Sequence, residues 1–80
     1  MNKIAAIKTA NQLIQSVDIK DYHFNQAKKM MAELDKKAGI FEYLKNPFIS
    51  TIMSLLTPYI GNYKVGQAVR LLLEALKESL

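Results

Sequence analysis

Hydrophobic residues recur at intervals of three and four along most of the chain, which is the period of an α-helix rather than of a β-strand. In the amino-terminal part, the apolar positions that share one side of a helix are Ile4, Ile7, Ala10, Leu13, Ile14 and Val17. After a polar break at residues 18–21, a second apolar set follows at Phe24, Ala27, Met31, Leu34 and Ala38. The pattern predicts two amphipathic helices, the second capped by Asp18 or Asp21 and ended by Gly39.

Two further helices are predicted in the carboxy-terminal half. Asn46 followed by Pro47 is typical of a helix start, because a proline at the first helical position has no amide to leave unpaired. Pro58 is expected to kink or end this helix, and Gly61 with Asn62 to form a turn. The third helix presents Phe48, Ile52, Leu55, Leu56 and Tyr59, with Ile49, Met53 and Ile60 alongside. The last helix, from about residue 63 to residue 79, is expected to bury Val65, Ala68, Val69, Leu72, Leu73, Leu76 and Leu80.

Short connections between four apolar-faced helices favour a small antiparallel bundle, so the predicted fold class is all-α with residues 1–80 as one domain. Half of the residues are hydrophobic, which is too many for a disordered chain. A chain this short buries only about 60 to 65 per cent of its unfolded surface, so assembly would add to a marginal stability. A second copy of the chain is therefore one possible partner.

Residues 46–63 contain no charged residue, although Lys45 and Lys64 stand at the two ends of this segment. Its 18 residues reach the lower limit for a membrane span, but its amides, hydroxyls and prolines are too polar for hydrocarbon, so no transmembrane segment is expected. On a helix, one face of the segment consists of Ser50, Ser54 and Thr57. Small hydroxyl side chains at this spacing allow a second helix to approach closely, whereas a solvated face would usually carry Lys or Glu. Two interpretations stay open: the bundle covers the segment on both sides, or the segment forms an interface.

Few residues offer catalytic or metal-binding chemistry. The chain has no cysteine, so neither a disulfide nor a thiolate metal site can form. His23 is the only histidine, and its cluster with Asp18 and Asp21 is better explained as a capped helix start than as a metal or proton-transfer site. The serines lie in no nucleophile motif, and the glycines form no phosphate-binding loop. No enzymatic activity, metal site or cofactor is expected.

The chain carries 11 basic and seven acidic residues, a formal net charge of +4. The lysines of the second helix alternate with Glu33 and Asp35, which is typical of a solvated face. A helix-turn-helix arrangement of the last two helices would offer only Lys64, Gln67 and Arg70 to DNA, few for such a reader. Because the net charge is positive, a small DNA- or RNA-binding regulatory protein is nevertheless the alternative function. The amino terminus lacks the apolar run of a secretory signal, so a cytoplasmic location is expected.

The main hypothesis is a non-enzymatic protein-interaction module that uses the carboxy-terminal half of the chain. Leu71 supports it, because this leucine falls among the polar positions of the last helix. The residues predicted to bind a protein partner are Ser50, Ser54, Thr57, Tyr63, Lys64, Arg70 and Leu71.

Several sequence features together resemble one family. The chain is short, basic and free of cysteine, and residues 18–21 precede a lysine-rich helix. Phe41-Glu42-Tyr43-Leu44 and Leu55-Leu56-Thr57-Pro58 then precede a leucine-rich last helix. This order resembles the bacteriocin immunity proteins of the enterocin A type. The resemblance implies a cytosolic four-helix bundle that protects its producer cell from a pore-forming peptide by association with the membrane receptor of that peptide. It also implies that the region from Asn46 onward sets specificity.

Overall fold

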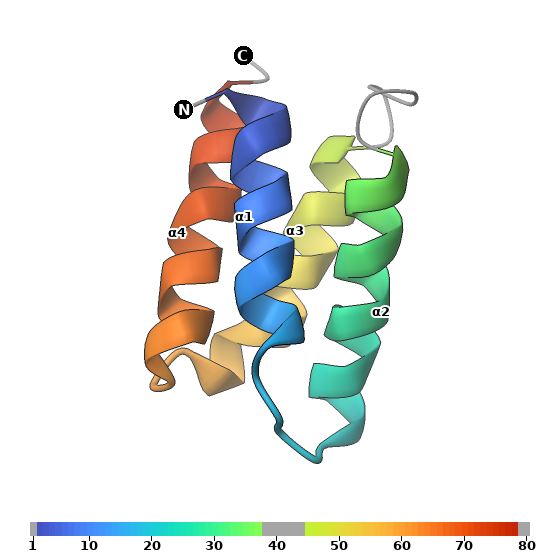
Figure 1. Ribbon diagram of the computed structural model, residues 1–80, viewed down its shortest axis with the longest axis vertical. Coiled ribbons are helices and arrows are strands. Elements are labelled where there is room, and N and C mark those ends of the chain that lie inside the picture. The colour runs from blue at the N-terminus through green and yellow to red at the C-terminus, as the bar shows by residue number, and fades with distance from the viewer. Residues whose placement is uncertain (1, 38–44, 79–80) are drawn as a thin grey trace.

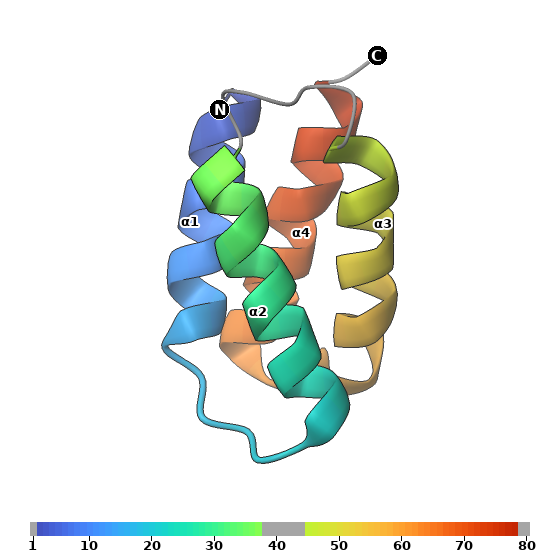
Figure 2. The same cartoon turned by 90° about the vertical axis from the view of Figure 1, so that its right-hand side faces the viewer.

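The computed structural model describes residues 2–37 and 45–78, which form an up-and-down bundle of four α-helices (Figure 1). The helices are α1 (Lys3–Gln15), α2 (Tyr22–Lys37), α3 (Lys45–Leu56) and α4 (Tyr63–Lys77), with a short 3-10 helix, η2 (Thr57–Tyr59), between α3 and α4. Helices adjacent in sequence pack side by side, and α1 also packs against α4 (Figure 2). The predicted all-α antiparallel bundle is confirmed.

Side-chain caps determine where three of the helices begin. The carboxylate of Asp21 accepts a hydrogen bond from the backbone amide of His23 at 2.9 Å, so Asp21 rather than Asp18 caps α2. Asn2 accepts from Ala5 at the start of α1, and Asn62 accepts from the amides of Lys64 and Val65 at the start of α4. The predicted turn at Gly61 and Asn62 is confirmed, and its second residue also caps the helix that follows.

The two prolines act at opposite ends of α3. This helix begins at Lys45, so the prediction that Asn46 precedes it and Pro47 takes its first position is wrong. Pro47 is tolerated inside the first turn because amides there have no partner within the helix. The predicted break at Pro58 is confirmed, since α3 ends at Leu56 and the chain continues as a 3-10 turn. Gly39, predicted to end α2, lies outside the described residues, as do Ala38 and Leu80.

The core follows most of the predicted pattern, and the apolar seam of α2 is confirmed at Phe24, Ala27, Met31 and Leu34. The prediction that Leu73 is buried is wrong, because its exposed fraction is 45%. Ile4, which shares the apolar side of the first helix, has an exposed fraction of 51%. The buried residues of α1, the following loop, α3 and α4 are Ala6, Ile7, Ala10, Ile14, Val17, Ile49, Ile52, Leu56, Val65, Ala68, Leu72 and Ala75.

Leu73 of α4 is exposed because of the way in which α1 and α4 pack. Leu71 packs against the core and lines a groove with Thr9 and Leu13 of α1. The buried face of α4 is therefore turned toward α1, which leaves Leu73 at the edge that faces away from α1. Fully buried Ala6 and Ala75, one on each helix, add small side chains to the core that the sequence pattern had not assigned.

Across the described ranges, every helix is too short or too polar to cross a lipid bilayer.

Candidate interaction surface

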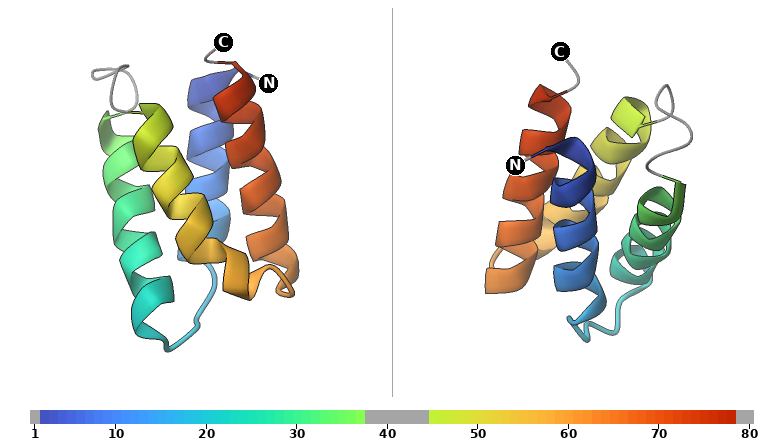
Figure 3. Two further views of the ribbon diagram at one scale, coloured as in Figure 1. Left: turned by 180° about the vertical axis from the view of Figure 1, so that it is seen from behind. Right: turned by 45° about the horizontal axis from the view of Figure 1, so that its top comes forward.

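The segment from residue 46 to residue 63 buries some of its apolar side chains in the core and exposes its small polar side chains to solvent. Ile49, Ile52 and Leu56 are fully buried against the bundle. The residues of this segment that are exposed are Asn46, Pro47, Ser50, Thr51, Ser54, Thr57, Pro58, Ile60, Gly61, Asn62 and Tyr63. None of them is charged, and we refer to them as the uncharged surface. The interpretation that the bundle covers this helix on both sides is wrong, since Ser50, Ser54 and Thr57 are exposed. Seen from behind, α3 lies in front of the other helices (Figure 3, left).

Two threonines of the uncharged surface bond to their own helix. The hydroxyl of Thr51 donates to the carbonyl oxygen of Pro47 at 3.0 Å, and the hydroxyl of Thr57 donates to that of Met53 at 2.8 Å. Bonds of this kind, from a hydroxyl to the carbonyl four residues earlier, supply the hydroxyl proton with an acceptor inside the helix. A partner that covered either threonine would not need to provide an acceptor, so burial of these side chains carries little polar cost.

Large exposed side chains lie at the end of the bundle where α2 and α4 begin. Ile60 and Tyr63 have exposed fractions of 53% and 77%, and that of Tyr22 is 71%. Each tyrosine is the first residue of its helix, and its hydroxyl accepts a hydrogen bond from the glutamine four residues later, Gln26 at 2.6 Å and Gln67 at 3.0 Å. Both rings are thus held against their helices, which lowers the entropy lost if a partner covers them.

A hydrogen bond between distant segments fixes the geometry of this end. The hydroxyl of Tyr59 donates to the carboxylate of Asp21 at 2.5 Å, and the Tyr59 ring meets the edge of Phe24 with centroids 5.3 Å apart. The bond from Tyr59 holds the pKa of Asp21 below its usual 3.8, helped by the bond from the His23 amide. The same bond raises the pKa of Tyr59 above its usual 10. Both groups titrate farther from neutral pH than usual, so the pair is suited to holding structure rather than to transferring protons.

Histidine and acidic side chains are the metal ligands that this chain could offer. Of the residues that the structure describes, no three of these side chains gather closely enough to hold a metal ion. Asp21 is already engaged by Tyr59 and by the amide of His23.

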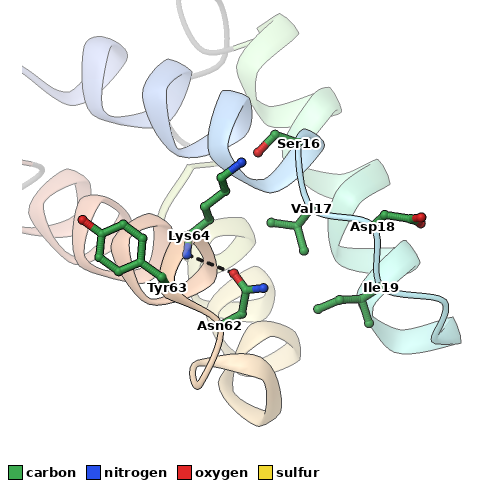
Figure 4. Close-up of a pocket in the computed structure, with 7 residues that line it drawn as sticks. All are labelled: Ser16, Val17, Asp18, Ile19, Asn62, Tyr63 and Lys64. Carbon is green, nitrogen blue, oxygen red and sulfur yellow. Dashed lines mark hydrogen bonds between the residues drawn. The ribbon is translucent and has the colours of Figure 1, made fainter.

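A groove of about 370 Å³ separates the loop after α1 from the start of α4 (Figure 4). Val17 and Ile19 form its apolar side, and the side chain of Lys64 extends across it toward Ser16, while the carboxylate of Asp18 points away (Figure 4). Tyr63 lines the rim and its ring turns outward (Figure 4). The structure therefore places Lys64 beside the α1–α2 loop rather than on the uncharged surface.

A second groove, of about 360 Å³, runs between α1 and α4 and is lined by Thr9, Leu13, Gln67, Arg70 and Leu71. Leu71 is half-buried, since it packs against the core and also lines this groove, and its role in binding a partner stays a prediction. The seven predicted partner-binding residues thus fall in three places: the open face of α3, the end of the bundle, and the α1–α4 groove. The four of them that lie on α4, Tyr63, Lys64, Arg70 and Leu71, do not share one surface, although they are close in sequence.

Sequence reasoning missed Tyr22 and Ile60 as exposed residues. Tyr22 could have been recognised from its place directly after the capping Asp21, since the first residue of a helix is often solvated. Ile60 was assigned to the third helix, although Pro58 ends the helical period before it. Side chains beyond that break no longer follow the apolar face.

The orientation of α3 and α4 bears on nucleic-acid binding. The two helices are antiparallel neighbours in the bundle (Figure 2). The helices of a helix-turn-helix cross at about 90 to 120 degrees, so that the second can enter the major groove. Of the three side chains that would face DNA, Lys64 crosses the first groove, and Gln67 and Arg70 line the second. This geometry does not favour the DNA-binding alternative.

Comparisons of the chain with protein-family models, with curated proteins and with solved structures find no match.

Proposed function

We propose that this chain is a small protein-interaction module whose docking surface is the uncharged surface of α3 and the turn that follows it. One observation carries the proposal: every exposed residue described between positions 46 and 63 is uncharged. The centres of protein interfaces are depleted in charged residues and enriched in tyrosine, and solvated helix faces usually carry charge. Tyr63 and Ile60 provide large apolar contacts at one end of this surface, and Thr51 and Thr57 provide contacts with little polar cost.

For the partner, we propose the membrane receptor of a pore-forming peptide, with or without that peptide bound. This finer proposal depends on the resemblance to the bacteriocin immunity proteins, which act on such a receptor from the cytoplasm. The resemblance gives the region from Asn46 onward the role of setting specificity, and the uncharged surface lies within this region. The lack of charge and the resemblance select the same part of the chain.

Substitution of Ser54 by Glu tests the docking surface, because it places a carboxylate in the middle of the uncharged surface. The matched control is Gln12→Glu, which adds the same charge at an exposed position on α1. Both variants should unfold within about 0.5 kcal/mol of the parent chain, since neither position is buried. In a binding assay on solubilised membranes, the parent chain and Gln12→Glu should retain the same membrane protein. Ser54→Glu should retain at least about tenfold less, the effect expected of an unpaired charge in an interface.

Two results would contradict the proposal. Equal retention by Ser54→Glu and Gln12→Glu would mean that α3 does not touch the partner. Loss of helicity in Ser54→Glu, measured by circular dichroism, would make position 54 part of the fold rather than of an interface. Protection of sensitive cells that express the chain from a pore-forming peptide tests the finer proposal separately, because the docking surface could serve a different membrane protein.

A further inference from the structure

The formal net charge of the chain resides on two adjacent helices. α1 and α2 carry six lysines against Glu33 and Asp35, and this excess of four equals the formal net charge of the whole chain. The remaining basic and acidic residues balance each other. The helices α1 and α2 pack side by side, so the excess lies on one half of the bundle (Figure 3, right).

The two acidic residues of these helices are engaged by neighbours. Glu33 pairs with Lys37 at 3.2 Å, one turn away. The carboxylate of Asp35 is half-buried and accepts a hydrogen bond from the side chain of Asn11 at 3.4 Å. Lys28 is also occupied, since its ammonium donates to the carbonyl of Val17 at 2.9 Å. The acids that alternate with the lysines of α2 indicated a solvated face in the sequence. In the structure they are engaged by neighbours, and some lysines keep no acidic partner among the described residues.

Besides the paired Lys37, three lysines of these helices are exposed: Lys8 on α1, and Lys29 and Lys36 on α2. Within the described ranges, none of the three lies within salt-bridge distance of a carboxylate. We refer to Lys8, Lys29 and Lys36, together with the two exposed apolar residues Ile4 and Tyr22, as the basic face.

Helical spacing places these residues on one side of the molecule. Tyr22, Lys29 and Lys36 are seven residues apart, which is two turns, so they form one exposed line along α2. Ile4 and Lys8 are one turn apart on α1 and share the side of Asn11, whose side chain reaches Asp35 of α2. The side of α1 that carries Ile4 and Lys8 is therefore the side next to α2, and its exposed residues belong to the outer surface of this helix pair.

We infer that the basic face docks the protein on an anionic lipid surface. The exposed lysines complement lipid phosphates, and each lysine near such a surface raises binding by roughly fivefold. The ring of Tyr22 suits the headgroup region, where tyrosine is enriched, and Ile4 can bury apolar surface at the boundary with the acyl chains. Nucleic acid would use the lysines equally well but would gain little from the isoleucine, so the lipid surface is the better fit. The uncharged surface lies mainly on α3, so it stays available for a protein partner.

Vesicle binding tests the inference with a matched pair of variants. The probe is phosphatidylcholine vesicles with and without phosphatidylglycerol, and the readout is the fraction of protein that sediments with them. The first variant combines Lys8→Gln, Lys29→Gln and Lys36→Gln on the basic face. The control combines Lys64→Gln, Arg70→Gln and Lys77→Gln on α4, which removes the same net charge elsewhere.

The parent chain should bind vesicles that contain phosphatidylglycerol and should not bind those that lack it. The basic-face variant should lose binding by at least about thirtyfold, and the α4 control by less than about threefold. Ile4→Ser combined with Tyr22→Ser should weaken vesicle binding and leave any binding to random-sequence duplex DNA unchanged. Absence of binding by the parent chain, or equal losses in the two triple variants, would overturn the inference. Binding to DNA that is stronger than binding to the vesicles, with the same dependence on the three lysines, would overturn it in favour of nucleic acid.

Discussion

At the scale of single residues, the Asp21–Tyr59 hydrogen bond makes a prediction about pH. The pKa of Asp21 is lowered, so the bond stabilises the fold above the unfolded pKa of about 4 and loses its effect as pH falls through the folded-state pKa. The pKa of Tyr59 is raised, so the effect is complete below about 10 and is lost as pH rises through the folded-state value. Tyr59→Phe should therefore lower the unfolding free energy most between these limits, as measured by urea unfolding across pH.

Tyr63→Phe is the matched control for this prediction, because the hydroxyl of Tyr63 bonds to the neutral side chain of Gln67. The effect of Tyr63→Phe on the unfolding free energy should therefore stay the same as pH falls through the range in which Asp21 is protonated. In Tyr59→Phe, the pKa of Asp21 should rise toward 3.8, since the largest cause of its lowering is gone. An unchanged Asp21 pKa, followed by NMR of its carboxyl carbon, would show that the bond is absent in solution.

The same residues show what local sequence can decide. Asp18 and Asp21 both precede the second helix, and capping chemistry allowed either of them. The choice of Asp21 goes with its bond to Tyr59, which lies 38 residues away in sequence. A pattern of residue types can identify a helix start, but it cannot identify a partner that only the tertiary fold brings near.

At the scale of elements, α4 offers a direct test through two leucines that stand on either side of Leu72. Leu71 packs against the core, so Leu71→Ala should lower the unfolding free energy by about 1 to 2 kcal/mol, less than for a fully buried leucine. Leu73 is largely exposed, so Leu73→Ala should change the unfolding free energy by less than about 0.5 kcal/mol. Urea unfolding of both variants measures the difference. Equal effects, or a larger effect at position 73, would mean that α4 is rotated away from α1.

The three consecutive leucines also explain why the sequence pattern placed Leu73 rather than Leu71 on the buried face of this helix. A period of 3.6 residues shows that Leu72 is central to the apolar face, but a neighbour on either side can join it. The position of α1 decides between them, and α1 packs on the side of α4 that carries Leu71. Periodicity was enough to identify all four helices and the seam of α2. The rotation of α4 depended on contacts between helices that are distant in sequence.

At the scale of the whole molecule, the excess positive charge and the uncharged surface lie on different helices. The basic face lies on α1 and α2, and the uncharged surface on α3 and the following turn. A bundle with two different surfaces can bind two unlike partners at once, because neither site covers the other. If both proposals hold, the lipid surface raises the local concentration of the chain near a membrane-bound partner, which strengthens binding without any new contact. The sequence showed each charge, but only the helix arrangement showed that the charges separate.

A second copy of the chain could also bind the uncharged surface. Sedimentation velocity over a wide concentration range shows whether the protein is a monomer or a dimer. We expect a monomer, because two chains of net charge +4 repel each other. A dimer that Ser54→Glu dissociates, while Gln12→Glu does not, would mean that a second copy occupies the uncharged surface. The proposal of a different protein partner would then fail. A dimer unaffected by either substitution would use another face and would leave the uncharged surface open.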